Sequence, residues 1–261
     1  MSATTVATAT GRFVWRELMS TDPDRAKAFY TELFGWTVHP TDMGEMGTYD
    51  LLRNGEADFG GIVSLGAERG TPSHWLSSVT VASVDEATAK AAALGGTVAV
   101  PPTDIPGVGQ FSVVIDPQGA SFAPFTPLPE MPDAPAPERV PPVGGVAWNE
   151  LVTSDVEGAK AFYGEVAGWG VERADMGGPE PYTIIKRGDQ MEAGLMKKPD
   201  GVPLSMWVVY FHVADLDQTL ADITRLGGQP FGPIIDVPTV GRVSWATDPT
   251  GAVFALHEPL Q

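Results

Sequence analysis

The chain repeats itself once, and this repeat limits its possible folds more than any other feature of the sequence. Residues 11–38 read GRFVWRELMSTDPDRAKAFYTELFGWTV, and residues 144–171 read GGVAWNELVTSDVEGAKAFYGEVAGWGV. The similarity continues to the sequences DPQG at 116–119 and DPTG at 248–251. Two copies of one folding unit are therefore expected, and each candidate functional residue can be compared with its counterpart in the other copy.

The length and one proline-rich stretch predict how the two copies are divided. At 261 residues the chain is long enough for two domains, each of roughly 110–130 residues. Residues 124–142 read PFTPLPEMPDAPAPERVPP. Because proline fixes φ and removes a backbone donor, this stretch is expected to be neither helix nor central strand. We therefore predict one domain over residues 11–127, a semi-extended linker over 128–143 and a second domain over 144–261.

Each half reads as a βαβββ pattern that occurs twice. In the first half, residues 13–19 are a predicted strand, Asp22 follows as a helix N-cap, and apolar residues then recur at helical spacing. Three short strands are expected within residues 36–65, and a second helix over residues 85–94. The second half repeats this order, with Asp155 as the corresponding N-cap.

Composition excludes several classes of function. A net charge of −17 and a pI near 4.4 argue against a nucleic-acid or anionic-membrane partner, because both need a basic face. The absence of cysteine excludes disulfides, thiolate catalysis and Cys-ligated metals. The first ten residues, MSATTVATAT, lack the features of a signal peptide, and no apolar stretch is long enough to span a bilayer. We expect a soluble cytoplasmic protein that is a monomer or a homodimer.

Three motifs together resemble one known superfamily. They are the pattern D-x-x-x-A-x-x-F-Y-x-x-x-x-G-W at each first helix, a later helix that ends in LGG, and the final turn DPxG. This combination resembles the vicinal-oxygen-chelate superfamily of glyoxalases, bleomycin-resistance proteins and extradiol dioxygenases. The repeated WxEL before the helix is similar to a subgroup of two-domain actinobacterial proteins described as glyoxalase-like or as hydroxylases. The resemblance implies an α+β fold of tandem glyoxalase-like domains, in which four βαβββ modules form two cup-shaped, mostly antiparallel sheets.

The metal-ligand positions that this resemblance implies carry no ligand here. In metal-using members, His, Gln or Glu side chains at matched strand positions hold a divalent ion that acts as a Lewis acid. Counted from the helix-capping Asp and from the Asp of DPxG, the corresponding positions are Trp15, Trp148, Leu76, Val208, Ala123 and Ala255. None of these side chains can hold a metal ion, so we expect no metal cofactor.

A tryptophan and a glutamate stand near those positions in both copies. Because a strand alternates faces, Glu17 is expected to point into the same cup as Trp15, and Glu150 into the same cup as Trp148. Indole suits an aromatic or polycyclic ligand. The carboxylate could accept hydrogen bonds, pair with a cation, or act as a general base if burial raises its pKa. The alternative is structural, with tryptophans that fill the core and glutamates that are satisfied by backbone or arginine.

The second copy alone carries histidines on this side. By strand parity, His212 and His257 face the second cup, where the first copy has Thr80 and Phe125. With Glu150 they could form a displaced two-His-one-carboxylate triad that holds a divalent metal such as iron, zinc or nickel. The alternative is that both histidines lie at the rim, each with a single hydrogen bond or in solvent.

Two more side chains are candidate ligand contacts. His74 lies two residues before Leu76 and could face the first cup, although a lone histidine is more often a hydrogen-bonded structural residue. Arg242 ends the loop PTVGR and could reach an anionic group of a ligand in the second cup.

Three functions follow from these residues. The first, which we favour, is a metal-independent protein that binds a small aromatic or polycyclic metabolite, such as an antibiotic, in Trp-lined cups. The second is a tailoring enzyme of the hydroxylase or lyase kind, with Glu17 or Glu150 as the general base. The third is a metalloenzyme that uses Glu150, His212 and His257.

Overall fold

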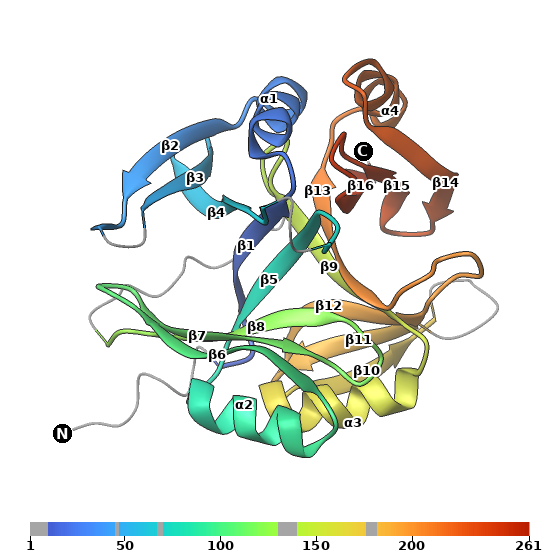
Figure 1. Ribbon diagram of the computed structural model, residues 1–261. Coiled ribbons are helices and arrows are strands. Elements are labelled where there is room, and N and C mark those ends of the chain that lie inside the picture. The colour runs from blue at the N-terminus through green and yellow to red at the C-terminus, as the bar shows by residue number, and fades with distance from the viewer. Residues whose placement is uncertain (1–9, 45–46, 67–69, 130–139, 176–181, 261) are drawn as a thin grey trace. The chain divides into compact units, whose positions relative to one another are not determined.

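Figure 1 shows a computed structural model of the chain, which describes residues 10–44, 47–66, 70–129, 140–175 and 182–260. The expectations for the N-terminal residues 1–9 and for residues 130–139 of the linker lie outside the described residues. Among the described residues, no helix combines the length and apolar character needed to cross a membrane.

The chain contains the predicted βαβββ module four times in succession. The first module is β1 (Phe13–Ser20), α1 (Pro23–Phe34), β2 (Thr37–Asp42), β3 (Thr48–Asn54) and β4 (Ala57–Ser64). The second is β5 (His74–Thr80), α2 (Val84–Ala93), β6 (Thr97–Ile105), β7 (Gly109–Ile115) and β8 (Ser121–Pro127). The third is β9 (Val146–Thr153), α3 (Val156–Ala167), β10 (Gly170–Ala174), β11 (Tyr182–Arg187) and β12 (Gln190–Lys197). The fourth is β13 (Met206–His212), α4 (Leu216–Arg225), β14 (Gln229–Val237), β15 (Gly241–Thr247) and β16 (Val253–Pro259).

The strands form two eight-stranded sheets, one for each repeat. Their orders are β2-β3-β4-β1-β5-β8-β7-β6 and β10-β11-β12-β9-β13-β16-β15-β14. Neighbours joined by a turn pair antiparallel, whereas β1 with β4, β5 with β8, β9 with β12, and β13 with β16 pair parallel. The predicted α+β fold of two glyoxalase-like sheets is therefore confirmed, with mixed strand orientation.

Local sequence signals fix the first helix of each repeat. The side chain of Asp22 accepts the backbone N–H of Arg25 (3.1 Å), and Asp155 accepts that of Gly158 (3.0 Å), as expected of N-caps. Each helix ends at a glycine in the left-handed conformation, Gly35 or Gly168.

The chain divides into two compact units that do not follow the repeat boundary. Unit 1 consists of the described residues within 1–15, 77–136 and 149–207, and unit 2 of those within 16–76, 137–148 and 208–261. Unit 1 thus holds most of the second and third modules, in which α2 lies beside α3, and unit 2 most of the first and fourth, in which α1 lies beside α4 (Figure 1). Each unit therefore contains helices and strands of both repeats.

Reciprocal tryptophan contacts join the two repeats inside each unit. In unit 2, Trp36 from the first repeat donates Nε1–H to the carbonyl of Gly144 at the start of the second (3.1 Å). In unit 1, Trp169 from the second repeat donates Nε1–H to the carbonyl of Gly11 at the start of the first (2.6 Å). Both indoles are buried, so the tryptophan that follows each first helix is a core residue.

One prediction about the proline-rich stretch is wrong, because Pro124 and Pro127 lie in the central strand β8. Pro124 is the register partner of Val79 on β5, but neither it nor Ala123 has a partner in the β7 ladder. Proline removes only its own donor, and the strand continues because the N–H of Val81 donates to the carbonyl of Phe125 (2.9 Å). The proline therefore leaves a gap in one ladder instead of ending the strand.

Candidate functional site

The first strand of each repeat buries a leucine beneath a helix, and in β1 the opposite face is less covered. On β1, Leu18 lies in the core of unit 2, whereas Trp15 and Glu17 are only partly buried. Alternation along the strand places Trp15 and Glu17 on the face opposite the helix. On β9, Leu151 takes the core position and Trp148 and Glu150 lie on the opposite face. We call these two surfaces the helix-free faces.

A tyrosine holds the glutamate of the first repeat. Tyr49, on β3, places its hydroxyl 2.8 and 3.0 Å from the two carboxylate oxygens of Glu17 and donates to that carboxylate. Gly61, on β4, is the register partner of Glu17. A Cβ atom at Gly61 would overlap the Tyr49 hydroxyl and press on the Glu17 carboxylate, so only glycine leaves room for this pair.

The second repeat builds the same arrangement with the same residue types. Tyr182, on β11, donates its hydroxyl proton to Glu150 across 2.6 Å. Gly194, on β12, is the register partner of Glu150, and a Cβ atom there would overlap the Tyr182 hydroxyl. Glu150 is 4% exposed, so this carboxylate is far more buried than Glu17. We call the two pairs the Glu–Tyr dyads.

The dyads supply defined hydrogen-bonding chemistry. A carboxylate has about four acceptor sites, so it can accept from a tyrosine and from further donors at the same time. Hydrogen bonds to ionised groups are short and strong, and they fix the orientation of the carboxylate. Each tyrosine thus holds the carboxylate of its dyad in a defined orientation.

Sequence reasoning missed the two tyrosines. Tyr49 and Tyr182 lie 32 residues after their glutamates, and Gly61 and Gly194 lie 44 residues after them. The constant spacing in both copies was a signal that a full comparison of the repeats could have found. Its meaning depends on the pairing of β3 with β4 and of β11 with β12, which joins these residues in space.

The positions that hold metal in relatives are apolar and well packed. Leu76, Val208, Ala123 and Ala255 are all buried. They offer no donor atom, so the residues present do not fit a metal at the superfamily's usual position. Among the described residues, no group of three or more His, Asp or Glu side chains could hold a metal ion, and Glu150, His212 and His257 therefore do not form such a group.

Both histidines of the second repeat make hydrogen bonds to backbone carbonyls. His212 Nδ1 lies 2.5 Å from the carbonyl oxygen of Pro141, and His257 Nε2 lies 3.2 Å from that of Val240. The two residues are direct register partners on β13 and β16. Burial, and to a lesser extent the neighbouring His212, lowers the pKa of His257. Near neutral pH His257 is therefore an uncharged imidazole.

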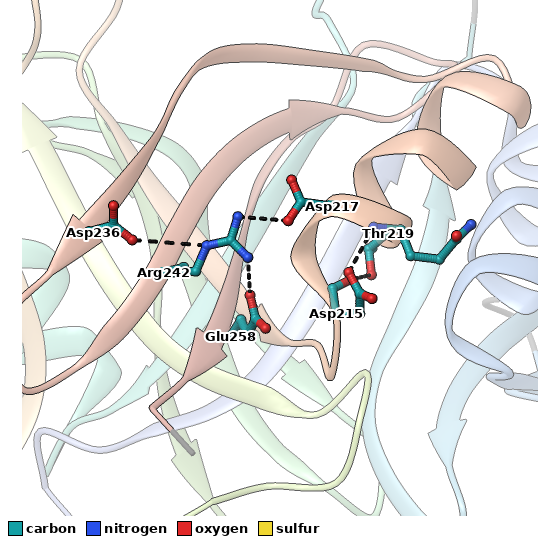
Figure 2. Close-up of polar contacts among 7 residues, drawn as sticks. Asp215, Asp217, Thr219, Asp236, Arg242 and Glu258 are labelled. Carbon is teal, nitrogen blue, oxygen red and sulfur yellow. Dashed lines mark hydrogen bonds and ion pairs between the residues drawn. The ribbon is translucent and has the colours of Figure 1, made fainter.

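Arg242 lies on the helix-covered side of its sheet, not on the helix-free face. Figure 2 shows its guanidinium between three carboxylates, at 2.8 Å from Asp217, 2.9 Å from Glu258 and 3.9 Å from Asp236. Asp217 belongs to the first turn of α4, which covers this face. Hydrogen bonds to Asp217 are the largest cause that raises the pKa of Arg242. Its positive charge is thus paired with carboxylates of the protein itself.

His74, at the start of β5, makes a local contact. Its Nδ1 lies 2.9 Å from the carbonyl oxygen of Pro72, two residues earlier. This bond belongs to the turn that leads into the strand, and it joins His74 to no other candidate residue.

A buried Trp–Tyr–Asp chain of hydrogen bonds connects the repeats in unit 1. Trp207 Nε1 donates to the hydroxyl oxygen of Tyr163 (2.9 Å), which donates to Asp116 Oδ2 (3.0 Å). Burial raises the pKa of Asp116 and raises that of Tyr163 well above its ordinary value. Tyr163 belongs to the second repeat and Asp116 to the DPQG turn of the first. The perturbed groups here serve the core, since all three side chains are buried.

Unit 2 contains the counterpart of this chain, but it is less complete. Trp75 Nε1 donates to the hydroxyl oxygen of Tyr30 (3.1 Å). Burial raises the pKa of Asp248, whereas hydrogen bonds from Thr250 and Ala252, and to a smaller extent the Tyr30 hydroxyl, lower it. Among the described residues, however, Asp248 Oδ2 has no partner in hydrogen-bonding geometry.

The sequence and the fold place the chain in a known superfamily. The model of the Glyoxalase/Bleomycin resistance protein/Dioxygenase superfamily matches residues 12–123 and 145–256. The chain therefore belongs to this superfamily and has one such domain in each repeat.

Two named relatives match almost the whole chain. The chain is 35% identical over 250 residues to the Mycobacterium tuberculosis protein CFP32, which is named a glyoxylase, and the match covers 94% of each chain. It is 29% identical over 269 residues to the anthracycline biosynthesis protein DauV of Streptomyces sp. strain C5, covering 96% of this chain and 94% of DauV. Among solved structures, the Mn(II)-bound glyoxalase of Novosphingobium aromaticivorans matches with a TM-score of 0.62 at 17% identity, over 97% of this chain and 83% of that one. The last likeness concerns the fold alone.

Proposed function

We propose that this protein binds a small aromatic or polycyclic ligand against the helix-free faces of β1 and β9, without the help of a metal ion. The observation that carries the proposal is the Glu–Tyr dyad, which occurs with the same residue types and spacing in both repeats, and whose glutamate follows a tryptophan by two residues in the sequence. The indoles of Trp15 and Trp148 supply flat apolar area, and the dyads supply oriented acceptors for ligand hydroxyl groups.

Two further findings support an aromatic ligand and metal-free binding. The chain resembles proteins named for anthracycline biosynthesis over almost its whole length, and an anthracycline is a polycyclic aromatic compound that bears hydroxyl groups. The superfamily's metal positions hold apolar side chains in both repeats, so ligand recognition would depend on the protein's own hydrogen-bonding groups.

The test uses 1,8-dihydroxyanthraquinone as a polycyclic probe, with the protein dialysed against EDTA and followed by titration calorimetry. We expect saturable binding that Glu17→Gln and Glu150→Gln weaken by about tenfold, which corresponds to about 1.4 kcal/mol. Trp15→Leu and Trp148→Leu should weaken it by a similar factor. The control is Glu86→Gln, an exposed glutamate at the start of α2. Binding that appears only when a divalent metal is added, or that none of the four variants changes, would contradict the proposal.

One observation favours a tailoring enzyme as the second candidate function. In unit 1, the Tyr182 hydroxyl donates a hydrogen bond of 2.6 Å to the buried carboxylate of Glu150. Such a pair can take a proton from a bound ligand and return it. Glu150 would remove the proton, and Tyr182 would hold the carboxylate in position.

Anthrone in D₂O tests this second function, because its central methylene is weakly acidic and its exchange is visible by proton NMR. We expect exchange faster than in buffer, lost in Glu150→Gln and reduced in Tyr182→Phe, while both variants still bind anthrone. Exchange at the buffer rate with the native protein, under saturating anthrone, would leave ligand binding as the only proposed function.

A further inference from the structure

A row of aromatic side chains lies in unit 2, on the face of strands β13, β16 and β15 that is opposite α4. Tyr210 on β13 and Trp245 on β15 are both register partners of Ala255, on the strand between them. Because Ala255 has only a methyl side chain, the two rings meet across it, and Trp245 Nε1 donates to the Tyr210 hydroxyl oxygen (3.1 Å). Phe231 packs edge-on against Trp245 at a centroid distance of 5.6 Å. The indole is held in place yet remains partly exposed.

The next row of the same face carries two oriented hydrogen-bond acceptors. A carbonyl oxygen can only accept, so His212 Nδ1 at Pro141 and His257 Nε2 at Val240 must each carry the hydrogen. In a neutral imidazole the other ring nitrogen is then an acceptor. His212 Nε2 and His257 Nδ1 have no hydrogen-bond partner within the part of the chain that the structure describes.

The first repeat has none of these features. At the positions that correspond to the four ring-bearing residues, it has the side chains Ser78, Val113, Thr80 and Phe125. These residues provide no indole and no ring-nitrogen acceptor. At these four positions the second repeat alone therefore has an indole and two imidazoles.

Charge selects the kind of ligand that this surface can hold. The chain carries a net charge of −17, and the nearby cation Arg242 lies on the opposite face between three carboxylates. An anionic ligand therefore finds no available cation here among the described residues of this face, whereas a neutral O–H group finds two ring nitrogens that can accept it.

We propose that this face, formed by Tyr210, Trp245, His212 and His257, binds a neutral hydroxylated aromatic ring. The ring packs against the Trp245 indole and donates its O–H to a histidine nitrogen. The inference rests on the proposed ligand-binding function, and it names the ligand class, but its residues are separate from both Glu–Tyr dyads.

The experiment compares two probes that differ only in the donor, 2-naphthol and 2-methoxynaphthalene. Binding to the full chain is followed in ¹H–¹⁵N spectra through the seven tryptophan indole N–H signals, with the Trp245 signal assigned from Trp245→Phe. We expect 2-naphthol to shift the Trp245 signal saturably and to bind at least fivefold more tightly than its methyl ether. His257→Phe, which installs the residue of the first repeat, should remove this preference without weakening the ether. The matched control in the first repeat is Val113→Ala, with unfolding curves for every variant.

The outcomes separate this inference from the general proposal. Equal binding of the two probes, or a preference that survives both His257→Phe and His212→Thr, would overturn it. So would shifts confined to Trp15 and Trp148 that depend on Glu17 and Glu150, although the dyad proposal would then stand. A Trp245 shift with full hydroxyl preference in Glu17→Gln and Glu150→Gln would support this site and remove the dyads from ligand binding.

Discussion

The two Glu–Tyr dyads have the same residues and the same spacing, yet they differ in burial. In unit 1, Glu150 is nearly inaccessible and its bond to Tyr182 is 2.6 Å long. In unit 2, Glu17 is partly exposed and its shorter contact with Tyr49 is 2.8 Å. The pair is therefore the same in both repeats, while its surroundings set its access to solvent. The buried dyad is better suited to proton transfer, and the exposed one to reversible binding.

The buried Trp–Tyr–Asp chains show a similar contrast. In unit 1 the Tyr163 hydroxyl accepts a hydrogen bond from Trp207 and donates one to Asp116. In unit 2, Asp248 Oδ1 accepts from the backbone N–H and the hydroxyl of Thr250, at 2.7 and 2.8 Å, while Oδ2 has no partner among the described residues. The first repeat has Gln118 in place of Thr250. The two turns thus differ both in this residue and in the hydrogen bonds that their aspartate accepts.

The largest expected difference between the units is in the free energy of unfolding that is lost by Tyr163→Phe compared with Tyr30→Phe. The first change leaves both Trp207 Nε1 and Asp116 Oδ2 without a partner, and each buried unsatisfied group costs about 1–3 kcal/mol. The second leaves only Trp75 Nε1, so its loss of unfolding free energy should be about half as large. Urea denaturation followed by tryptophan fluorescence and circular dichroism measures both.

Trp207→Phe in the Tyr163→Phe background is the control. It removes the indole donor that Tyr163→Phe leaves without a partner. The double variant should therefore lose less unfolding free energy than the sum of the losses of the two single variants. Equal losses for the two tyrosine variants would show that Asp248 is bonded as firmly as Asp116.

A smaller loss is expected when the glycine beside either dyad becomes alanine. In Gly194→Ala the new Cβ overlaps the Tyr182 hydroxyl in a buried setting, and overpacking of this kind costs about 1–3 kcal/mol. Gly61→Ala should fall at the low end, because Glu17 is partly exposed and can move, whereas Glu150 is buried. Urea midpoints give the order of the two effects.

Gly164→Ala is the matched control for steric overlap. This glycine lies in α3, where a Cβ meets only an ordinary contact at 3.5 Å, so alanine should be neutral or stabilise by about 0.5–1 kcal/mol. If all three alanine variants behave alike, the glycines do not hold the dyads in place.

The smallest effect is a pH dependence that only the second repeat should show. The folded pKa of His257 is lowered from 6.5, so the unfolded chain binds the proton more readily. Stability should therefore rise with pH between the folded pKa and 6.5, and this contribution should be lost as the pH falls through the folded pKa. The titratable neighbour on the same face is His212, while Arg242 and Glu258 lie on the other face. His257→Phe should flatten the curve, as measured by urea unfolding from about pH 5 to pH 8. Parallel curves for the two proteins would contradict the prediction.

Much of the architecture follows from local sequence signals. The N-caps Asp22 and Asp155, the terminal glycines Gly35 and Gly168 and the period of apolar residues predict four βαβββ modules, because these signals act within a few residues. Pro124 shows where such reasoning ends. A proline is excluded from a strand only when its missing donor is needed, and that need depends on which neighbour the strand acquires.

The candidate site was less predictable, for two physical reasons. Tyr49 reaches Glu17 only through the pairing of β3, β4 and β1, which no local pattern encodes. The contacts between the repeats were also not predictable, because two similar copies offer the same contact partners. A residue can then pack against its own copy or against the other one. The prediction for Arg242 failed for a different reason, because Arg242 was treated as a loop residue, whereas it belongs to β15 and lies on the helix-covered side of that strand.

The reciprocal contacts of Trp36 with Gly144 and of Trp169 with Gly11 bear on how the protein arose. In a two-fold symmetric dimer, residue i of one subunit contacts residue j of the other, and j contacts i. This chain obeys that rule between its own halves, so two half-length chains of the same pattern would make these contacts as a homodimer. Fusion of such a dimer frees each half to change alone. The halves can then differ at one matched position, as His257 and Phe125 do, which no symmetric homodimer allows.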